Sequence, residues 1–366
     1  MKGEIFLTGA TGFIGSSLLH KWLITRPDVR VTLLVRRRRD ESPQVRMERI
    51  FGEFYPAADA SSLGLRVSIL EGDISLANFG LKETQYRDLA ARTSHIIHCA
   101  AAVRFDLPLE EARSINVAGS EGILALARNC RELDRIDYVG TAYVAGKRKG
   151  LIKENDLDLG QEHNNTYERT KLESESLMRR AMSDLPITIH RPSIVICDST
   201  TGRISRYSAF YRMLRTYHLG YLKALPGYPT TLLDLVPMDY VADAIYAIAG
   251  SPDTLGKCYH LTAGLTNLTS FEEVSLLAAR HFGRPAFEII PLAHFEAFVS
   301  KMTEGLSARE RDLIDEMRIY HPYLAADVRF DNSNTLAFLG LLSITVPKLS
   351  SYFGKMAEYV VRLSTT

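Results

Sequence analysis

Residues 5–15 read Ile-Phe-Leu-Thr-Gly-Ala-Thr-Gly-Phe-Ile-Gly, an apolar run followed by three glycines at a spacing of three residues. The run 5–8 predicts a buried strand, and the apolar residues that recur at helical spacing after it predict a helix. Gly9 allows a tight turn, Gly12 lets the backbone approach a pyrophosphate, and Gly15 allows close packing of helix on strand. The helix N-terminus adds free N–H groups and a partial positive charge. We therefore expect a dinucleotide site with contacts from Gly9, Thr11, Gly12, Phe13, Ile14 and Gly15.

The composition is that of a globular protein. The chain has 366 residues, of which 46% are hydrophobic and 24% charged, and its net charge is +1, which gives no reason to expect a nucleic-acid partner. Its four cysteines have neither zinc-ligand nor disulfide spacing, so we expect no metal site and a reducing, cytoplasmic location. The sequence enters the first predicted strand at once and has no apolar run of about 20 residues. We therefore expect no signal peptide and no integral membrane span.

Predicted strands and helices alternate through the first half of the chain. Further buried strands are predicted at 31–35, 65–70, 95–99 and 136–141, with a long helix near 108–132. This alternation predicts an α/β fold, a Rossmann-type doubly wound parallel sheet with helices on both faces. Ligands bind at the carboxyl ends of the strands of such a sheet. The glycine loop and four residues that follow later strands would meet at that edge: Arg36, Asp73, Ala100 and Thr141.

Three of these strand ends suggest further contacts with the dinucleotide. Arg36 directly follows a strand and could accommodate a ribose 2′-phosphate, which favours NADP(H), although the run 36–39 could be only a solvated basic turn. Asp73, with Ile74 beside it, could accept from the adenine amino group or simply form a turn. Small side chains at Ala100, Ala101 and Ala102 would leave room for the cofactor, or would only allow close packing.

A phenol and an amine share one face of a later predicted helix. Tyr167 and Lys171 stand four residues apart, and Thr141 ends the preceding strand. A tyrosine pKa of about 10 is too high for proton transfer at neutral pH, and a neighbouring ammonium and an oxidised nicotinamide would both lower it. The Thr141 hydroxyl could bond a substrate carbonyl or the developing oxyanion, and Lys171 could hold ribose hydroxyls. Because these three residues follow a predicted nucleotide site in the sequence, they indicate an enzyme that transfers hydride to a carbonyl or from an alcohol.

These motifs together resemble the extended short-chain dehydrogenase/reductase superfamily over about residues 3–265. The likeness rests on 8–15, Gly72-Asp73, 98–101, 116–119, 138–141, Tyr167 with Lys171, Arg191-Pro192 and 236–243. The resemblance implies that Thr141, Tyr167 and Lys171 are the catalytic hydroxyl, acid and helper. Asn116 would match the helix asparagine that supports a proton relay in many members. Read from the sequence alone, Asn116 is a poor helix former that either caps or bends the helix locally, or bridges to another group.

Several stretches are similar to the thioester-reductase and fatty acyl-CoA reductase branch of that superfamily. They are 101–106, 140–144, 191–195 with Asp198 and Gly202, and 330–334. The branch implies NADPH-dependent reduction of an acyl thioester to an aldehyde or alcohol. The chain departs from the branch at Gly140, where a serine is common, and in its shorter length. It has no attached carrier module, so we expect the acyl group to arrive on CoA or on a separate carrier protein.

The rest of the chain predicts a smaller, mostly helical substrate domain. We expect a nucleotide domain over 1–195, completed by 236–262, and a cap formed by 196–235 and 263–366. A sixth strand over 186–192 would bring Pro192 and Ile194 to the nicotinamide. The aromatic and basic segment 207–218 could be an acyl tunnel wall, a membrane-surface helix or a helix packed on the sheet edge. Later helices, expected at 270–282, 293–304, 307–320 and 347–363, could line an apolar pocket or form a homodimer face.

Two other functions remain open from the sequence. One is a different extended-family enzyme that acts on a nucleotide sugar, a steroid or a ketone, although an apolar cap argues mildly against a sugar. The other is a non-catalytic regulator that senses NADP, which would have no need of Tyr167 and Lys171.

Overall fold

The fold is built on one parallel sheet. The computed structural model describes residues 3–54, 66–204, 208–295, 297, 311–312, 315, 318–324 and 326–364. Seven strands lie in the order β12-β7-β5-β4-β1-β2-β3, and all neighbours are parallel. Their bounds are β1 (Glu4–Thr8), β2 (Arg30–Val35), β3 (Val67–Glu71), β4 (Thr93–His98), β5 (Arg135–Val139), β7 (Ile187–Pro192) and β12 (Cys258–Leu261). This order confirms the predicted doubly wound sheet.

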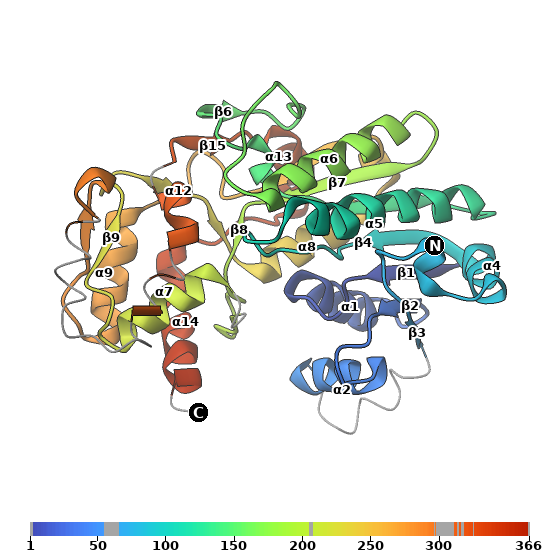
Figure 1. Cartoon of the computed structure of the whole chain (residues 1–366), viewed down its shortest axis with the longest axis horizontal. Coiled ribbons are helices and arrows are strands. Elements are labelled where there is room, and N and C mark those ends of the chain that lie inside the picture. Colours follow the sequence, from blue (N-terminus) through green and yellow to red (C-terminus); the bar gives the residue numbers. More distant parts are fainter. Residues whose placement is uncertain are drawn as a thin grey trace.

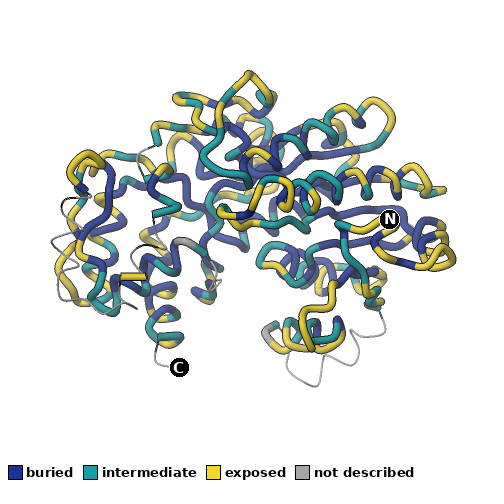
Figure 2. The backbone as a smooth tube through the Cα atoms, viewed as in Figure 1, coloured by how far each residue is buried: buried dark blue, intermediate teal, exposed yellow. Residues whose placement is uncertain are grey.

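Helices cover both faces of the sheet, as Figure 1 shows. One face carries α1 (Phe13–Thr25), α2 (Pro43–Phe54) and α8 (Met238–Ala249), whose apolar residues share a core with β1 and β2. The other face carries η1 (Ala77–Gly80), α4 (Glu83–Arg92), α5 (Leu109–Asn129) and α6 (Thr166–Ala181). In Figure 2 the strands between these layers are almost continuously buried, except for the edge strand β3, whose residues are intermediate or exposed. The continuous apolar runs of the sequence reflect this burial on both sides.

A second apolar core holds the cap. It is formed by α7 (Ala209–His218), α9 (Phe271–Phe282) and α14 (Leu349–Ser364), at the left of Figure 1. Three small pairings join the segments around it: β9 (Ala224–Pro226) with β14 (Glu288–Ile290), β10 (Leu232–Leu233) with β13 (Thr269–Ser270), and β8 (Ile194–Val195) with β11 (Leu235–Val236). The segment expected at 207–218 is therefore a packed helix of the cap over its described part.

Part of the C-terminal region lies with the sheet and not with the cap. β15 (Val328–Phe330) pairs with β6 (Gly150–Ile152), and α13 (Ser333–Leu339) with η5 (Gly340–Leu342) packs on β12 and α8. The expected assignment of all of 263–366 to the cap therefore differs from the structure at these residues. The helices expected at 293–304 and 307–320 fall largely outside the described residues. Of the described ones, 292–295, 297, 311–312 and 315 are helical. The chain then forms η4 (Arg318–Tyr320) and α12 (His321–Leu324). The remaining short elements are η2 (Ala142–Ala145) and η3 (Pro252–Thr254).

Candidate active site

The glycine loop between β1 and α1 has the shape that a pyrophosphate requires. Gly9 has a φ of +79°, and a Cβ there would lie 2.6 Å from the Ala100 nitrogen. A Cβ on Gly15 would collide with the backbone of Gly9. Gly12 is the N-cap of α1 without a side-chain cap, and its Cβ would contact only the Gly9 carbonyl, at 3.2 Å. The loop therefore presents bare backbone at a helix N-terminus, which fits a dinucleotide.

Arg36 and Asp73 meet at the ends of β2 and β3. Arg36 Nη1 lies 3.5 Å from Asp73 Oδ2, while Asp73 Oδ1 accepts from the Ser75 nitrogen at 2.9 Å and its hydroxyl at 2.8 Å. Burial raises the pKa of Asp73, but the bonds from Ser75 and the charge of Arg36 outweigh it, so the net shift is downward. The carboxylate is thus ionised at the edge where an adenosine would lie. Ile74 is buried and lies against Gly119 of α5.

Arg46 is a candidate cofactor residue that sequence reasoning missed. It stands on α2, donates to the Thr11 hydroxyl at 2.9 Å and also donates to the carbonyl of Arg36. Burial lowers the pKa of Arg46, and the charges of Arg36, Arg38 and Arg49 lower it further. Arg37 differs because it forms a bidentate pair with Glu71 at 2.7 and 2.8 Å. The signal available in the sequence was an arginine in the first turn of a helix directly after the basic run.

The alanine segment after β4 is held against the glycine loop. The Ala100 nitrogen donates to the Thr8 hydroxyl at 3.3 Å. The Asn116 amide accepts from the Ala102 nitrogen at 2.7 Å and donates to the Ala102 carbonyl at 3.2 Å and the Thr170 hydroxyl at 2.9 Å. Of the two interpretations of Asn116, bridging is therefore the one found. Its amide joins the alanine segment to α6, and its expected part in a proton relay stays a prediction.

Tyr167 and Lys171 lie on the first turns of α6, as their spacing predicts. Asn165 caps this helix by accepting from the Glu168 nitrogen at 3.0 Å. The buried Lys171 ammonium donates to the Val139 carbonyl at 2.9 Å and lies 4.4 Å from the centre of the Tyr138 ring. Burial lowers the pKa of Lys171 to about 8. The helix thus brings the amine to the carboxyl end of β5.

Thr141 completes the group at the end of β5. Its hydroxyl accepts from the Tyr143 nitrogen at 3.3 Å and lies 3.5 Å from the Pro192 carbonyl at the end of β7. Burial raises the pKa of the Tyr167 phenol to about 12, and a hydrogen bond with Thr141 acts in the opposite direction. The expectation that the phenol pKa is brought down toward neutral is therefore not met by these protein groups. The structure does bring Thr141, Tyr167 and Lys171 to one place.

The exit of β7 is fixed by a buried carboxyl group. Pro192 ends β7 and Ile194 begins β8. Between them, the Ser193 hydroxyl donates to Asp234 Oδ1 at 2.5 Å, and the same oxygen accepts from the Ala263 nitrogen at 2.8 Å. Burial raises the pKa of Asp234 to about 6. Asp234 thus holds the segment that was expected to face the nicotinamide.

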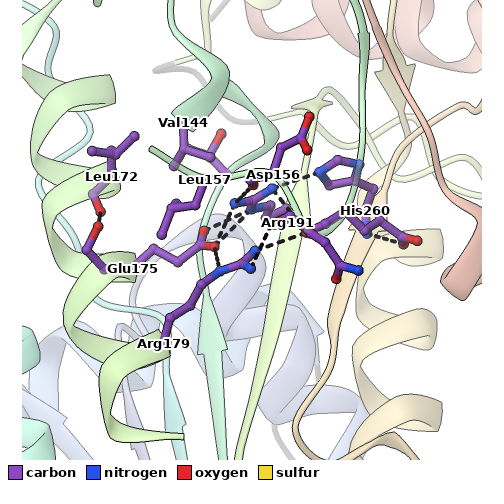
Figure 3. Close-up of polar contacts among 12 residues, drawn as sticks. Val144, Asp156, Leu157, Leu172, Glu175, Arg179, Arg191 and His260 are labelled. Carbon is purple, nitrogen blue, oxygen red and sulfur yellow. Dashed lines mark hydrogen bonds and ion pairs between the residues drawn. The ribbon is translucent and has the colours of Figure 1, made fainter. Parts of the chain in front are cut away.

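A buried ion network joins α6 to the neighbouring strands β7 and β12 (Figure 3). Arg191 of β7 pairs with Glu175 of α6 at 2.7 Å, and Arg179 pairs with the same carboxylate at 2.9 Å. The Arg191 guanidinium also contacts His260 Nε2 of β12 at 3.1 Å and donates to the Asp156 carbonyl at 2.7 Å. The network therefore fixes the helix that carries Tyr167 and Lys171 against two strands of the sheet.

The sheet order, the glycine loop and the Thr-Tyr-Lys group define an extended short-chain dehydrogenase/reductase. The sequence model of the male sterility protein family, an NAD-binding family, matches residues 7–245, and the chain belongs to this family. The expected superfamily and its thioester-reductase and fatty acyl-CoA reductase branch are confirmed.

Two curated proteins and one solved structure are similar to the chain. It is 32% identical to the nonribosomal peptide synthetase asaC of Aspergillus flavus, over 71% of this chain and 26% of that protein. It is 28% identical to human fatty acyl-CoA reductase 1, over 78% of this chain and 62% of that protein. The crystal structure of the terminal R domain from the myxalamid PKS-NRPS biosynthetic pathway superposes with a TM-score of 0.84 at 26% identity and covers all of this chain and 92% of that one.

These similarities confirm the class of the protein and leave finer points open. The family is an NAD-binding one and the human relative is named as a reductase, so the expected oxidoreductase class and a nicotinamide dinucleotide as cofactor are confirmed. The chain spans 26% of the length of the asaC protein and 62% of the length of the human reductase. UDP-glucuronic acid 4-epimerase from Bacillus cereus shares the fold, with a TM-score of 0.71 at 17% identity. Among the described residues, no helix is both long and apolar enough to span a membrane.

Proposed function

We propose that this protein is an NADPH-dependent reductase of acyl thioesters. The observation that carries the proposal is the meeting of Thr141, Tyr167 and Lys171 at the end of β5, beside the glycine loop. The membership of the chain in a family with fatty acyl-CoA reductases supports the substrate class. The acyl group would arrive on CoA or on a separate carrier protein, and we propose a cytoplasmic enzyme.

The residues of the site have distinct parts in the proposed reaction. Bound NADPH would supply the hydride that adds to the thioester carbonyl carbon. The Tyr167 phenol gives its proton to the carbonyl oxygen, and the Thr141 hydroxyl stabilises the negative charge that develops there. Loss of the thiol then leaves the aldehyde, and a second round would give the alcohol. Lys171, fixed by the Val139 carbonyl, lies on the same helix face to hold the ribose hydroxyls.

The preference for NADPH over NADH is part of the proposal. The half-buried Arg46 of α2 donates to the carbonyl of Arg36 at the end of β2. The positive charges of Arg36, Arg38 and Arg49 act on Arg46 and lower its pKa. A dianionic 2′-phosphate would relieve this repulsion, since two arginines can each donate to its oxygens. The other cofactor contacts that we propose are those expected from the sequence: the loop 9–15, Asp73, 100–102, Pro192 and Ile194.

An assay with competing substrates tests the proposal. The protein would be mixed with NADPH and, separately, with acyl-CoAs of several lengths, ketones and nucleotide sugars, and the absorbance of the reduced cofactor followed. We expect oxidation of NADPH with acyl thioesters, with release of free thiol and an aldehyde or alcohol. Oxidation with ketones alone, or turnover of nucleotide sugars, would assign the protein to another extended-family activity. Cofactor binding without any turnover would favour the regulator.

A further inference from the structure

An aromatic cluster covers the proposed proton donor. The ring of Phe105, in the segment after β4, stacks on the Tyr167 ring with centroids 5.5 Å apart and planes at 24°. Two tyrosines of the C-terminal region hold Phe105 in turn: Tyr320 at 5.4 Å and Tyr323 at 5.6 Å between ring centroids. Residues about 150 positions beyond the catalytic helix therefore reach its phenol through one intermediate ring.

Tyr323 is also bound to the catalytic helix itself. Its hydroxyl donates to Glu168 Oε1 at 2.5 Å and accepts from the Asn165 amide at 2.7 Å. Glu168 directly follows Tyr167 and is fully buried, and its other oxygen accepts from the Asn164 nitrogen at 2.7 Å. The hydroxyl of Tyr323 therefore bonds the cap residue of α6 and the residue next to the catalytic tyrosine.

The ring of Tyr323 completes a continuous wall. It meets the Tyr143 ring edge to face at 5.1 Å, and Tyr143 lies two residues after Thr141. Tyr143 contacts Phe330 of β15 in the same way at 5.5 Å. Aromatic pairs at these distances each contribute about 0.5–1.5 kcal/mol beyond their buried area. Tyr323 thus contacts three segments of the site. They carry Thr141, the proposed oxyanion donor, Tyr167, the proposed proton donor, and Phe105, whose ring stacks on Tyr167.

We propose that Tyr323 is a positioning residue, a latch that fixes the Tyr167 phenol for proton transfer. The hydroxyl fixes the first turn of α6 through Glu168 and Asn165, and the ring fixes Phe105 against Tyr167. The proposal rests on the proposed function of the same site. It adds that Tyr323, in the described segment 318–324, sets the orientation of the proton donor through Glu168 and Phe105.

Replacement of one hydroxyl tests the latch. Tyr323→Phe keeps the ring and removes only the bonds to Glu168 and Asn165. We expect kcat for thioester reduction to fall about 10-fold to 100-fold, since a small misplacement of a reacting group is enough for such a loss, with the dissociation constant of NADPH unchanged. The matched control is Tyr352→Phe, because Tyr352 is buried in α14 and its hydroxyl has no hydrogen-bond partner within the described part of the chain. This control should leave kcat unchanged.

A double variant separates positioning from a general loss of structure. If the Tyr323 hydroxyl acts through Glu168, Tyr323→Phe combined with Glu168→Leu should be no slower than the slower single variant, because both changes break the same bond. Multiplied effects of the two changes, or an unchanged kcat in Tyr323→Phe, would overturn the proposal.

Hydrogen exchange tests the latch without relying on activity. In Tyr323→Phe we expect faster exchange of backbone amides in 318–324, in 101–107 and at the start of α6, and no such change in Tyr352→Phe. Unchanged exchange in all three segments would overturn the latch even in an active enzyme. If the wild type reduces no thioester while Tyr323→Phe still shows these exchange changes, the proposed function is contradicted and the latch stays supported.

Discussion

Tyr167, the proposed proton donor, has an environment that favours its protonated form. Burial raises the pKa of the phenol to about 12, and the Thr141 hydroxyl only partly offsets this. A phenol that keeps its proton until the carbonyl oxygen becomes basic is suited to the reductive direction of the proposed reaction. Burial acts oppositely on the neighbouring amine, since it lowers the pKa of Lys171 to about 8.

Removal of the phenol hydroxyl should abolish most of the activity and leave the cofactor bound. In Tyr167→Phe, we expect turnover to fall by about 10²–10⁴-fold, the usual contribution of a general acid. The ring still stacks on Phe105. Steady-state kinetics and NADPH titration by fluorescence measure the two effects. Turnover equal to that of the wild type would remove Tyr167 from the mechanism.

The arginines near the end of β2 should differ in their effect on cofactor choice. Arg36→Ala and Arg46→Ala should each weaken NADPH about 10-fold or more while weakening NADH less, because each removes a charge-assisted bond to a 2′-phosphate. Arg37→Ala is the control, since Arg37 is paired with Glu71. Titration of both cofactors against all three variants measures the selectivity. Equal losses for NADPH and NADH would contradict the preference.

Asp234 should make stability depend on pH in one direction. Burial raises the pKa of its carboxyl to about 6 in the folded protein, so between about pH 4 and pH 6 the folded state holds this proton more tightly than the unfolded state. The contribution of this carboxyl to the free energy of unfolding therefore falls as pH rises through this range. A shift of about two pKa units corresponds to about 3 kcal/mol in total.

Asp234→Asn removes this titration and keeps an oxygen that can accept from Ser193 and Ala263. The stability of the variant relative to the wild type should rise by about 1–2 kcal/mol between about pH 5 and pH 7.5, measured by urea unfolding. Parallel pH profiles for the two proteins would show that the carboxyl titrates normally.

At the scale of the element, two glycines of the loop between β1 and α1 are needed for different reasons, Gly9 for folding and Gly12 for cofactor binding. Gly9 needs its positive φ and its close approach to Ala100, so Gly9→Ala should destabilise the fold. Gly12 has an ordinary extended backbone, and its Cβ would contact only the Gly9 carbonyl at 3.2 Å. Gly12→Ala should therefore lower the stability of the free protein by only about 1 kcal/mol.

The same substitution should greatly weaken cofactor binding, because the added methyl group would occupy the place of the pyrophosphate. We expect a loss of NADPH affinity of at least about 100-fold in Gly12→Ala, measured by calorimetry, beside a nearly unchanged thermal transition. Normal affinity in a folded Gly12→Ala protein would show that the pyrophosphate does not approach this backbone.

The elements that could be predicted from the sequence are those that local pattern determines. The strand expected at 95–99 is β4 (Thr93–His98), and the helix expected at 108–132 is α5 (Leu109–Asn129), because continuous apolar runs and amphipathic periods mark them. The pairing of β6 with β15 joins residues almost 180 positions apart, and no local pattern marks it. The position of Arg46 beside Thr11 depends on how α2 packs, so sequence reasoning did not find it.

At the scale of the whole molecule, charged residues connect segments that lie far apart in the sequence. One of them joins the cap to the nucleotide domain, and another joins α13 to the sheet. Arg203, which follows Gly202 at the edge of the cap, lies 4.1 Å from the centre of the Phe54 ring of α2. Glu154 accepts from the backbone nitrogens of His260 at 2.9 Å and Asn334 at 2.7 Å, and so holds α13 to the sheet. The predicted domain boundary missed this return of the chain because it depends on contacts between distant segments, such as the pairing of β15 with β6 and the packing of α13 on β12.

The network around Arg191 should be the most sensitive of these connections. Arg191 and Glu175 are fully buried, and the guanidinium bonds α6, β12 and the segment that contains Asp156. Removal of one member of a buried pair leaves the other charge without full compensation, so Arg191→Met should lower the free energy of unfolding by about 3–5 kcal/mol. Arg128→Met is the control, because the pair of Arg128 with Asp184 is about half exposed and should be worth about 0–1 kcal/mol.

A double replacement distinguishes the charge from the volume of the side chain. Arg191→Met combined with Glu175→Leu removes both buried charges, so it should be more stable than Arg191→Met alone, although the bonds to His260 and Asp156 are still lost. Urea unfolding of the three variants and the wild type measures the order. A double variant less stable than Arg191→Met would show that shape and packing hold α6 on the sheet and that the buried charges contribute little.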